Sequence, residues 1–171
     1  MARRLGFPLL LAFVVVDYLR PQDSIGALVG KPVAIVAVLP VAACLLASLR
    51  RPVLRDPVSL AMAAIVAFAA AWVPFATNNF WAFQAFKFLL VAWITMLAIA
   101  TFVDRPGRLH KLLALLLAVF AVQALSALRT GGHGTNGYFG DENDLALGLN
   151  AAIPFAVMSL RVPRGSVARA L

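Results

Sequence analysis

Long apolar runs separated by short polar segments dominate the hydrophobic pattern of this chain. The alternation of apolar and polar residues that is typical of strands is absent, and the Leu-, Ala- and Val-rich runs are too long for barrel strands. Because backbone groups in lipid must pair within their own segment, the pattern predicts membrane-spanning helices. The stretches without Asp, Glu, Lys or Arg are Leu5–Val16, Pro32–Leu49, Pro57–Phe86, Phe88–Val103, Leu112–Leu128 and Leu145–Leu160.

The longest uncharged run contains a turn signal and is divided there. Pro74 followed by Thr77-Asn78-Asn79 favours a turn, which separates a third helix from a fourth that begins near Phe80. The sequence therefore predicts an all-α fold, a polytopic integral membrane bundle of about six transmembrane helices in one domain, residues 1–171. Its spans are expected at about 5–19, 32–49, 58–75, 81–103, 110–128 and 144–161, with an outer glycine-rich loop at 129–143.

The composition excludes an ordinary water-soluble globule. Hydrophobic residues make up 63% of the 171 residues and charged residues 13%, whereas soluble domains are nearer half apolar and a quarter charged. A net charge of +8 would favour nucleic acid as a partner of a soluble protein. Here the basic residues lie between apolar runs, so we expect membrane lipid as a partner and no nucleic acid. The single cysteine, Cys44, is expected to be a small packed residue.

The basic residues also predict the orientation of the chain. Eleven of them lie in one alternate set of gaps between the runs and four in the other, so the first set is expected in the cytoplasm together with both termini. The first run is expected to be an uncleaved anchor, because no small-x-small cleavage site follows Val16. The larger set is Arg3, Arg4, Arg50, Arg51, Arg55, Arg105, Arg108, Lys111, Arg161, Arg164 and Arg169, and the smaller set is Arg20, Lys31, Lys87 and Arg129.

Two cations on the outer side are candidates for binding chemistry. Lys87 lies inside a predicted span, where a charge is costly and points to function, although snorkelling toward the outer headgroups explains it as well. Gln84 and Thr95 lie roughly on the same helical face. Arg20 is a planar donor suited to phosphate, or alternatively an interfacial anchor. Gln123, in the fifth span, favours a hydrogen bond between helices.

The segment from Gly131 to Gly140 contains five glycines in ten residues, so its backbone can approach a ligand closely. It leads into a helix for which Asn143 or Asp144 is the expected N-cap. The acidic residues Asp141, Glu142 and Asp144 could hold a divalent cation that bridges to phosphate, or they could complement the helix dipole. Their spacing does not fit an EF-hand, and no metal site is predicted.

The two histidines differ in their surroundings. His133 lies in the glycine-rich loop and could act as a base, whereas His110 lies between Arg108 and Lys111 and is expected at the membrane interface. No arrangement of catalytic side chains typical of a hydrolase or a zinc site is visible in the sequence.

Asp17-Tyr18-Leu19-Arg20-Pro21-Gln22-Asp23 and the later segment from Gly137 to Pro154 carry two motifs. Together they resemble the O-antigen ligase-like membrane proteins, and within them the branch of O-glycosylation ligases associated with exosortase systems. Asp17-Tyr18-Leu19-Arg20-Pro21-Gln22-Asp23 resembles the Tyr-x-Arg-Pro-Gln opening of that family. The segment Gly137–Leu147, followed by Asn150–Pro154, resembles the family's periplasmic Asp-x-Asn-x-x-Ala segment. Many relatives carry Pro where this chain has Glu142.

The resemblance implies a glycosyltransferase of the bacterial inner (cytoplasmic) membrane that takes a glycan from a polyprenyl-diphosphate carrier at the periplasmic face. The acceptor would be a glycan, a lipid or a protein, and no metal or nucleotide cofactor is implied. The family's catalytic Arg and His residues lie in a large periplasmic loop of its second half, to which nothing in residues 1–171 corresponds. The chain is therefore expected to be the N-terminal, donor-binding part of such a ligase or polymerase, a truncated domain that is inactive alone.

On this interpretation the residues that bind the diphosphate would be Lys87, the leading candidate, together with Arg20 and Arg129, since cations stabilise a diphosphate leaving group. Loop shaping and helix capping would fall to Gly137, Gly140, Asp141, Asn143 and Asp144. A different class stays open beside it, a small membrane transporter or a non-catalytic membrane subunit. The residues leave open which glycan and acceptor are used, and whether ligation or polymerisation is performed.

Overall fold

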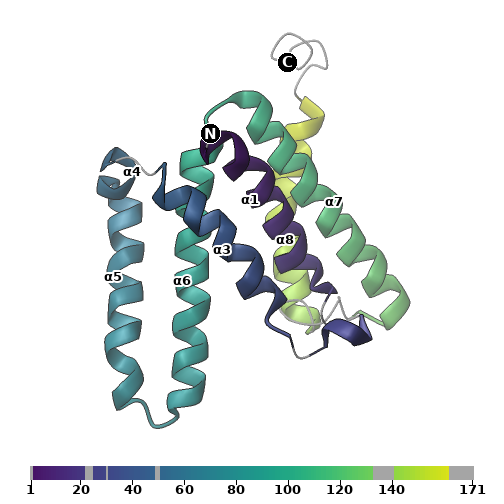
Figure 1. Cartoon of the computed structure of the whole chain (residues 1–171). Helices are drawn as coiled ribbons and strands as arrows, with labels where there is room; N and C mark the ends of the chain where they lie inside the picture. The colour runs from purple at the N-terminus through teal and green to yellow at the C-terminus, as the bar shows by residue number, and fades with distance from the viewer. Residues whose placement is uncertain (1, 22–24, 30, 49–50, 133–140, 162–171) are drawn as a thin grey trace. The chain divides into compact units, whose positions relative to one another are not determined.

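The computed structural model describes residues 2–21, 25–29, 31–48, 51–132 and 141–161, and within them every regular element is a helix (Figure 1). This confirms the prediction of an all-helical chain. In chain order the elements are α1 (Ala2–Leu19), η1 (Gly26–Leu28), α3 (Val33–Leu46), α4 (Arg51–Arg55), α5 (Pro57–Trp72), η2 (Val73–Phe75), α6 (Asn79–Phe102), α7 (Pro106–Thr130) and α8 (Glu142–Arg161).

Three segments among the described residues are long and apolar enough to cross a membrane, as expected of a membrane protein. They are Pro57–Phe75, Asn79–Phe102 and Pro106–Thr130, each with a mean hydropathy of 2.0 or above. The second predicted span is shorter than expected, because α3 ends at Leu46 and has 14 residues. At 1.5 Å per residue it is roughly 21 Å long, against a hydrocarbon core of about 30 Å.

The turn predicted within the longest apolar run is confirmed. Pro74 lies in the short helix η2, directly after α5, and the next helix begins at Asn79. Asn78 is the N-cap of α6, because its side-chain oxygen accepts a hydrogen bond from the Trp81 backbone N–H at 3.2 Å. This bond pairs one of the N–H groups that the first turn of a helix leaves unsatisfied.

The N-cap of the last helix lies earlier in the sequence than predicted. The helix α8 already begins at Glu142, and the carboxylate of Asp141 accepts a hydrogen bond from the Asn143 backbone N–H at 2.7 Å. Asp141 is therefore the cap rather than Asn143 or Asp144. The physical reason is that a capping oxygen pairs with a backbone N–H two or three residues later, so the residue at which the backbone enters the helix takes the position, and here that residue is Asp141.

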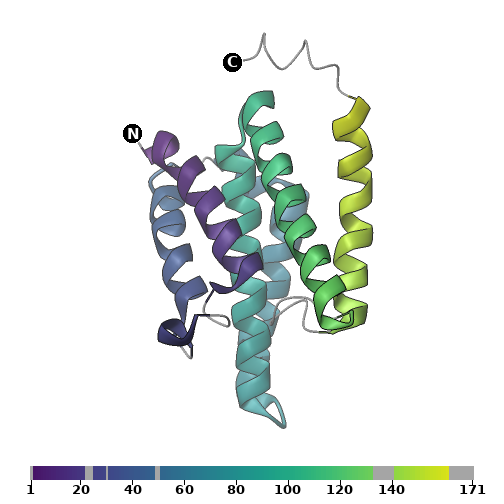
Figure 2. The ribbon, with the colours of Figure 1, turned by 90° about the vertical axis from the view of Figure 1, so that its right-hand side faces the viewer.

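The chain divides into two compact units, which are described separately. Unit 1 comprises Met1–Leu10 and Val38–Val103, and unit 2 comprises Leu11–Ala37 and Asp104–Leu171. Unit 1 contains the antiparallel hairpin of α5 and α6 (Figure 1). Unit 2 contains the antiparallel pair of α7 and α8, which lie side by side (Figure 2).

Close approach of helices organises the core of unit 1. The ring of Phe102, near the end of α6, is fully buried and rests against Gly6 of α1. A methyl group added to Gly6 would overlap this ring, so the contact requires a residue without a side chain. Small residues at such positions let membrane helices approach one another closely.

Candidate functional site

Lys87 occupies the membrane-spanning part of α6, in unit 1. It follows the first residue of the helix, Asn79, by eight positions, which corresponds to roughly 12 Å along the axis. Its ammonium nitrogen lies 5.1 Å from the centroid of the Phe83 ring, one turn closer to Asn79, and the side chain is half-buried. The lysine side chain therefore points toward the N-terminus of α6, as helical side chains generally do.

The surroundings of Lys87 leave its charge available to a further anion. The aromatic face of Phe83 attracts the cation without neutralising it, an interaction worth about 2 kcal/mol in a desolvated place. Among the described residues no carboxylate forms an ion pair with Lys87, whereas Arg108 is paired with Asp104 at 3.0 Å. Gln84 is half-buried on the same helix, and the Thr95 hydroxyl donates to the Val91 carbonyl at 2.8 Å.

Arg20 follows the last residue of α1, in unit 2. Its backbone has φ 46°, and among the described residues it is the non-glycine residue with a positive φ. Its backbone N–H still donates to the Val16 carbonyl at 3.1 Å, so the helix closes with a left-handed residue. This conformation is disfavoured for residues with a Cβ atom.

The end of α1 is held against α7 by a polar and an aromatic contact. The side-chain amide of Gln123 is fully buried, and its Nε2 atom donates to the Tyr18 carbonyl at 2.8 Å. The rings of Tyr18 and Phe120 meet edge to face, with centroids 5.8 Å apart. The prediction that Gln123 makes a hydrogen bond between helices is confirmed. Arg20 lies two residues after Tyr18, whose carbonyl is held by this hydrogen bond.

Arg129 lies exposed in the last turn of α7, at the same end of unit 2. The helix ends at the left-handed Gly131, and a Cβ atom added to Gly132 would lie 3.3 Å from Cγ of Glu142. The start of α8 is therefore next to the end of α7 (Figure 2). Tyr18 contacts Phe120 and Gln123 in the C-terminal half of α7, which also carries Arg129, so the end of α1 and the start of α8 both lie toward this half of the helix.

The acidic side chains at this end are exposed, and Asp141 is engaged in capping. Glu142 and Asp144 lie in the first turn of α8, where negative charge complements the helix dipole. The described residues contain no group of His, Cys, Asp and Glu side chains that could hold a metal ion. Gly137, Gly140 and His133 lie outside the described residues.

Two further sequence candidates occupy separate places. His110, in the first turns of α7, has its Nδ1 atom 2.8 Å from the Pro106 carbonyl. Cys44 is half-buried in α3. Since Lys87 belongs to unit 1 while Arg20 and Arg129 belong to unit 2, the grouping of all three cations around one ligand stays a prediction.

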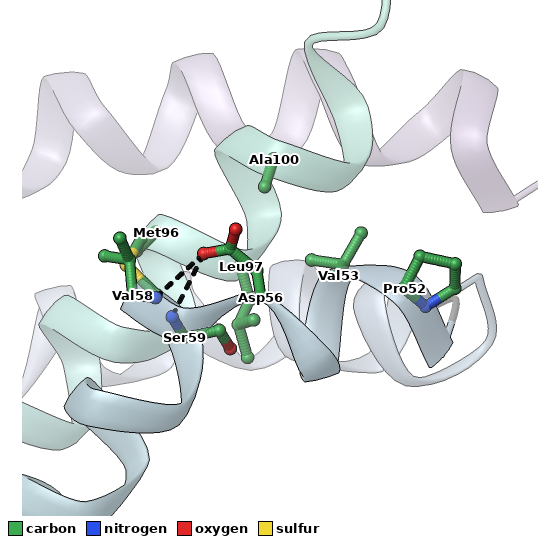
Figure 3. A pocket seen from close by; sticks show the side chains of 8 residues that line it. All are labelled: Pro52, Val53, Asp56, Val58, Ser59, Met96, Leu97 and Ala100. Carbon is green, nitrogen blue, oxygen red and sulfur yellow. Dashed lines mark hydrogen bonds between the residues drawn. The ribbon is translucent and has the colours of Figure 1, made fainter.

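A pocket that the sequence did not indicate lies in unit 1, where α4, α5 and α6 meet (Figure 3). Its volume is about 380 Å³, and its walls are mainly apolar. Asp56 caps α5 there by accepting from the backbone N–H groups of Val58 and Ser59 at 3.0 and 3.3 Å. The lining residues are Pro52, Val53, Asp56, Val58, Ser59, Met96, Leu97 and Ala100.

The Asp56-Pro57 pair is a recognisable helix start. The approach of α6 to it, which creates the pocket, has no signature in the sequence.

No protein-family model, curated protein or solved structure matches this chain. What the chain can do chemically is therefore inferred from its residues and their geometry. Two features bear on ligand binding: the cations Lys87, within α6, and Arg129, exposed at the end of α7, and an apolar pocket beside a basic segment.

Proposed function

We propose that this chain is the donor-binding part of a bacterial inner-membrane glycan ligase or polymerase, which uses a polyprenyl-diphosphate-linked glycan at the periplasmic face. The observation that carries the proposal is that two segments distant in the sequence both lie against the part of α7 that leads to its end in unit 2. One contains Tyr18 and Arg20, and the other contains Asp141 and the start of α8; both belong to the segments that resemble the O-antigen ligase-like proteins. A shared location is what joint action on one donor would require.

The proposal includes a bundle of about six spans with both termini in the cytoplasm. The positions of the basic residues within unit 1 support it. Gly6 lies near Phe102, and the residues after Arg55 line a pocket with Leu97 and Ala100. The arginine-bearing segments at the start of α1 and in α4 are thus at the same end of unit 1, as a common cytoplasmic side would require.

In this function Lys87 would contact the diphosphate of the donor. A cation at this depth is costly unless it faces protein, water or an anion. Phe83 lowers that cost and leaves the positive charge uncompensated. A charge-assisted hydrogen bond to an anion contributes about 1.5–3 kcal/mol, so this one residue would account for a tenfold to hundredfold part of the donor affinity.

The test is the binding of undecaprenyl diphosphate to the purified chain in nanodiscs, measured by native mass spectrometry. We expect Lys87→Ala to weaken binding about tenfold or more and Lys87→Arg to keep part of it, since the charge is retained. Lys111→Ala is the matched control, because Lys111 is an exposed lysine near the start of α7. Equal binding by the parent chain and Lys87→Ala would refute the role of Lys87.

The orientation is tested separately with single cysteines in a Cys44→Ser background. Thr77→Cys and Thr130→Cys, both at exposed positions, should react with a membrane-impermeant maleimide added to intact spheroplasts. Asp104→Cys should react only after the membrane is permeabilised. If Thr130→Cys is protected in intact spheroplasts, the donor-binding end cannot face the periplasm, and the proposal fails.

A further inference from the structure

We propose that the pocket between α4, α5 and α6 binds one anionic phospholipid. Its phosphate would lie next to Arg55, one ester carbonyl would accept from the Ser59 hydroxyl, and part of an acyl chain would lie on Met96 and Leu97. Three properties of the pocket support this occupant: its apolar walls, its buried hydroxyl group and the charge beside it. It does not depend on the glycan ligase function.

The apolar walls fit a segment of hydrocarbon. Val53, Val58, Met96 and Leu97 line a volume of about 380 Å³, which is at the small end of ligand pockets. A pocket of this size holds part of an acyl chain rather than a whole lipid. It lies where α5 begins, so it is at the level at which acyl chains meet the headgroup region.

The buried hydroxyl group indicates a ligand that can accept a hydrogen bond. Ser59 is only 2% exposed and lines the pocket, and its Oγ atom has no hydrogen-bond partner among the described residues. An unpaired buried hydroxyl costs free energy that a bound acceptor would recover. Thr101 and Trp93 also carry unpaired buried polar atoms, but neither lines the pocket. An ester carbonyl is the acceptor that a diacyl lipid presents between its phosphate and its chains.

The charge beside the pocket indicates an anionic headgroup. Arg55 ends α4, is exposed and forms no ion pair within the described part of the chain. Arg51 begins the same short helix. The one acid of the lining, Asp56, already accepts two backbone hydrogen bonds (Figure 3). Basic residues next to a span attract anionic lipids, so headgroup, ester and chain meet matching groups in the order in which a phospholipid carries them.

The experiment measures lipid binding to the full chain in detergent by native mass spectrometry, with dioleoyl phosphatidylglycerol and dioleoyl phosphatidylcholine as probes. We expect one phosphatidylglycerol to be retained preferentially. Arg55→Gln should weaken that binding roughly fivefold, the effect of one basic residue near an anionic surface. The matched control is Lys111→Gln, at an exposed lysine on α7, and it should change nothing.

Filling the pocket tests the proposed contact with the acyl chain of the lipid. Ala100→Phe places a ring in the lining and should abolish the retained lipid, whereas Ala85→Phe adds the same ring at an exposed position of the same helix, away from the pocket, and should not. Circular dichroism checks that both variants keep their helices. Equal retention of phosphatidylglycerol by Ala100→Phe and Ala85→Phe, with both folded, would overturn the proposal.

The hydroxyl contact has its own test. Ser59→Ala should weaken the binding of diester phosphatidylglycerol by roughly threefold to tenfold, the range for one hydrogen bond. It should leave the binding of the diether analogue unchanged, because that lipid has no ester carbonyl. Inorganic phosphate at millimolar concentration should not displace the lipid. Displacement by phosphate would identify a simple anion site and would refute the phospholipid as occupant.

Discussion

In unit 1 the ring of Phe102 rests against Gly6, whereas in unit 2 the amide of Gln123 donates to the Tyr18 carbonyl. Both contacts hold the helix α1, one near its beginning and one near its end. The first is a van der Waals contact between a ring and a glycine and involves no polar side chain. The second is a hydrogen bond between a polar side chain and a carbonyl near the end of a helix. The comparison shows the two means by which helices associate where lipid removes the hydrophobic driving force, close packing on small residues and hydrogen bonding between helices.

The largest expected effect is that of removing the Phe102 ring from its contact with Gly6 in unit 1. Phe102→Ala removes a fully buried ring and should lower the free energy of unfolding by about 3–5 kcal/mol, measured by steric trapping in bicelles. Phe80→Ala, at a ring that is 62% exposed, should have almost no effect. Equal losses in the two variants would mean that Phe102 is not part of a packed core.

A change at Gly6 tests the same contact from the side of α1. Gly6→Ala should cost about 1–3 kcal/mol through overpacking, while Gly26→Ala, where no atom lies within 4 Å of the added Cβ, should not. In the double variant with Phe102→Leu the cost of Gly6→Ala should shrink, because the two residues are in contact. An additive pair would contradict the packing described.

A smaller effect is expected from the polar contact in unit 2. Gln123→Leu keeps a buried side chain of similar size but leaves the Tyr18 carbonyl without this donor, at a cost of about 1–2 kcal/mol. The corresponding change at the half-buried Gln84, Gln84→Leu, is the control and should be close to neutral. If Gln123→Leu is as stable as the parent chain, the hydrogen bond between α1 and α7 contributes nothing to unit 2.

The smallest effect concerns the start of α8. Asp141→Ala should lower the free energy of unfolding by about 1 kcal/mol because it removes an N-cap, and Asp141→Asn should restore most of it. Asn143→Ala should be nearly neutral, since only the backbone N–H of this residue takes part in the cap. Thermal unfolding followed by circular dichroism distinguishes the two sites. A larger loss of stability in Asn143→Ala than in Asp141→Ala would show that Asn143 is the cap.

The sequence predicted those features that depend on local chemistry. Pro74 and Asn78 determine where α5 and α6 separate, because a proline and a capping amide act on their immediate neighbours. Gln123 was correctly expected to bond another helix, since a lone amide in an apolar helix has few other ways to pair. The cap of α8 was placed wrongly because Asp141, Asn143 and Asp144 are all suitable caps, and only the backbone geometry decides among them.

Features that depend on distant residues could not be predicted. Nothing near Gly6 in the sequence shows that a ring from α6 will occupy the space that a side chain at this position would fill. The pocket beside Ser59 likewise needs Met96 and Leu97 from another helix. Lys87 and Arg20 could be singled out as candidates because unusual charge is visible along the chain. Their surroundings, the Phe83 ring and the strained end of α1, became visible only in three dimensions.

The left-handed backbone of Arg20 makes this residue an unusually clean target for mutagenesis. Glycine adopts φ 46° without the steric penalty that arginine pays, so Arg20→Gly removes the guanidinium while relieving the backbone. Most substitutions that abolish binding leave open whether the fold was damaged as well. Here relief of the backbone offsets part of the cost of losing the side chain, so a lost affinity for the donor in a folded variant would report on the missing charge.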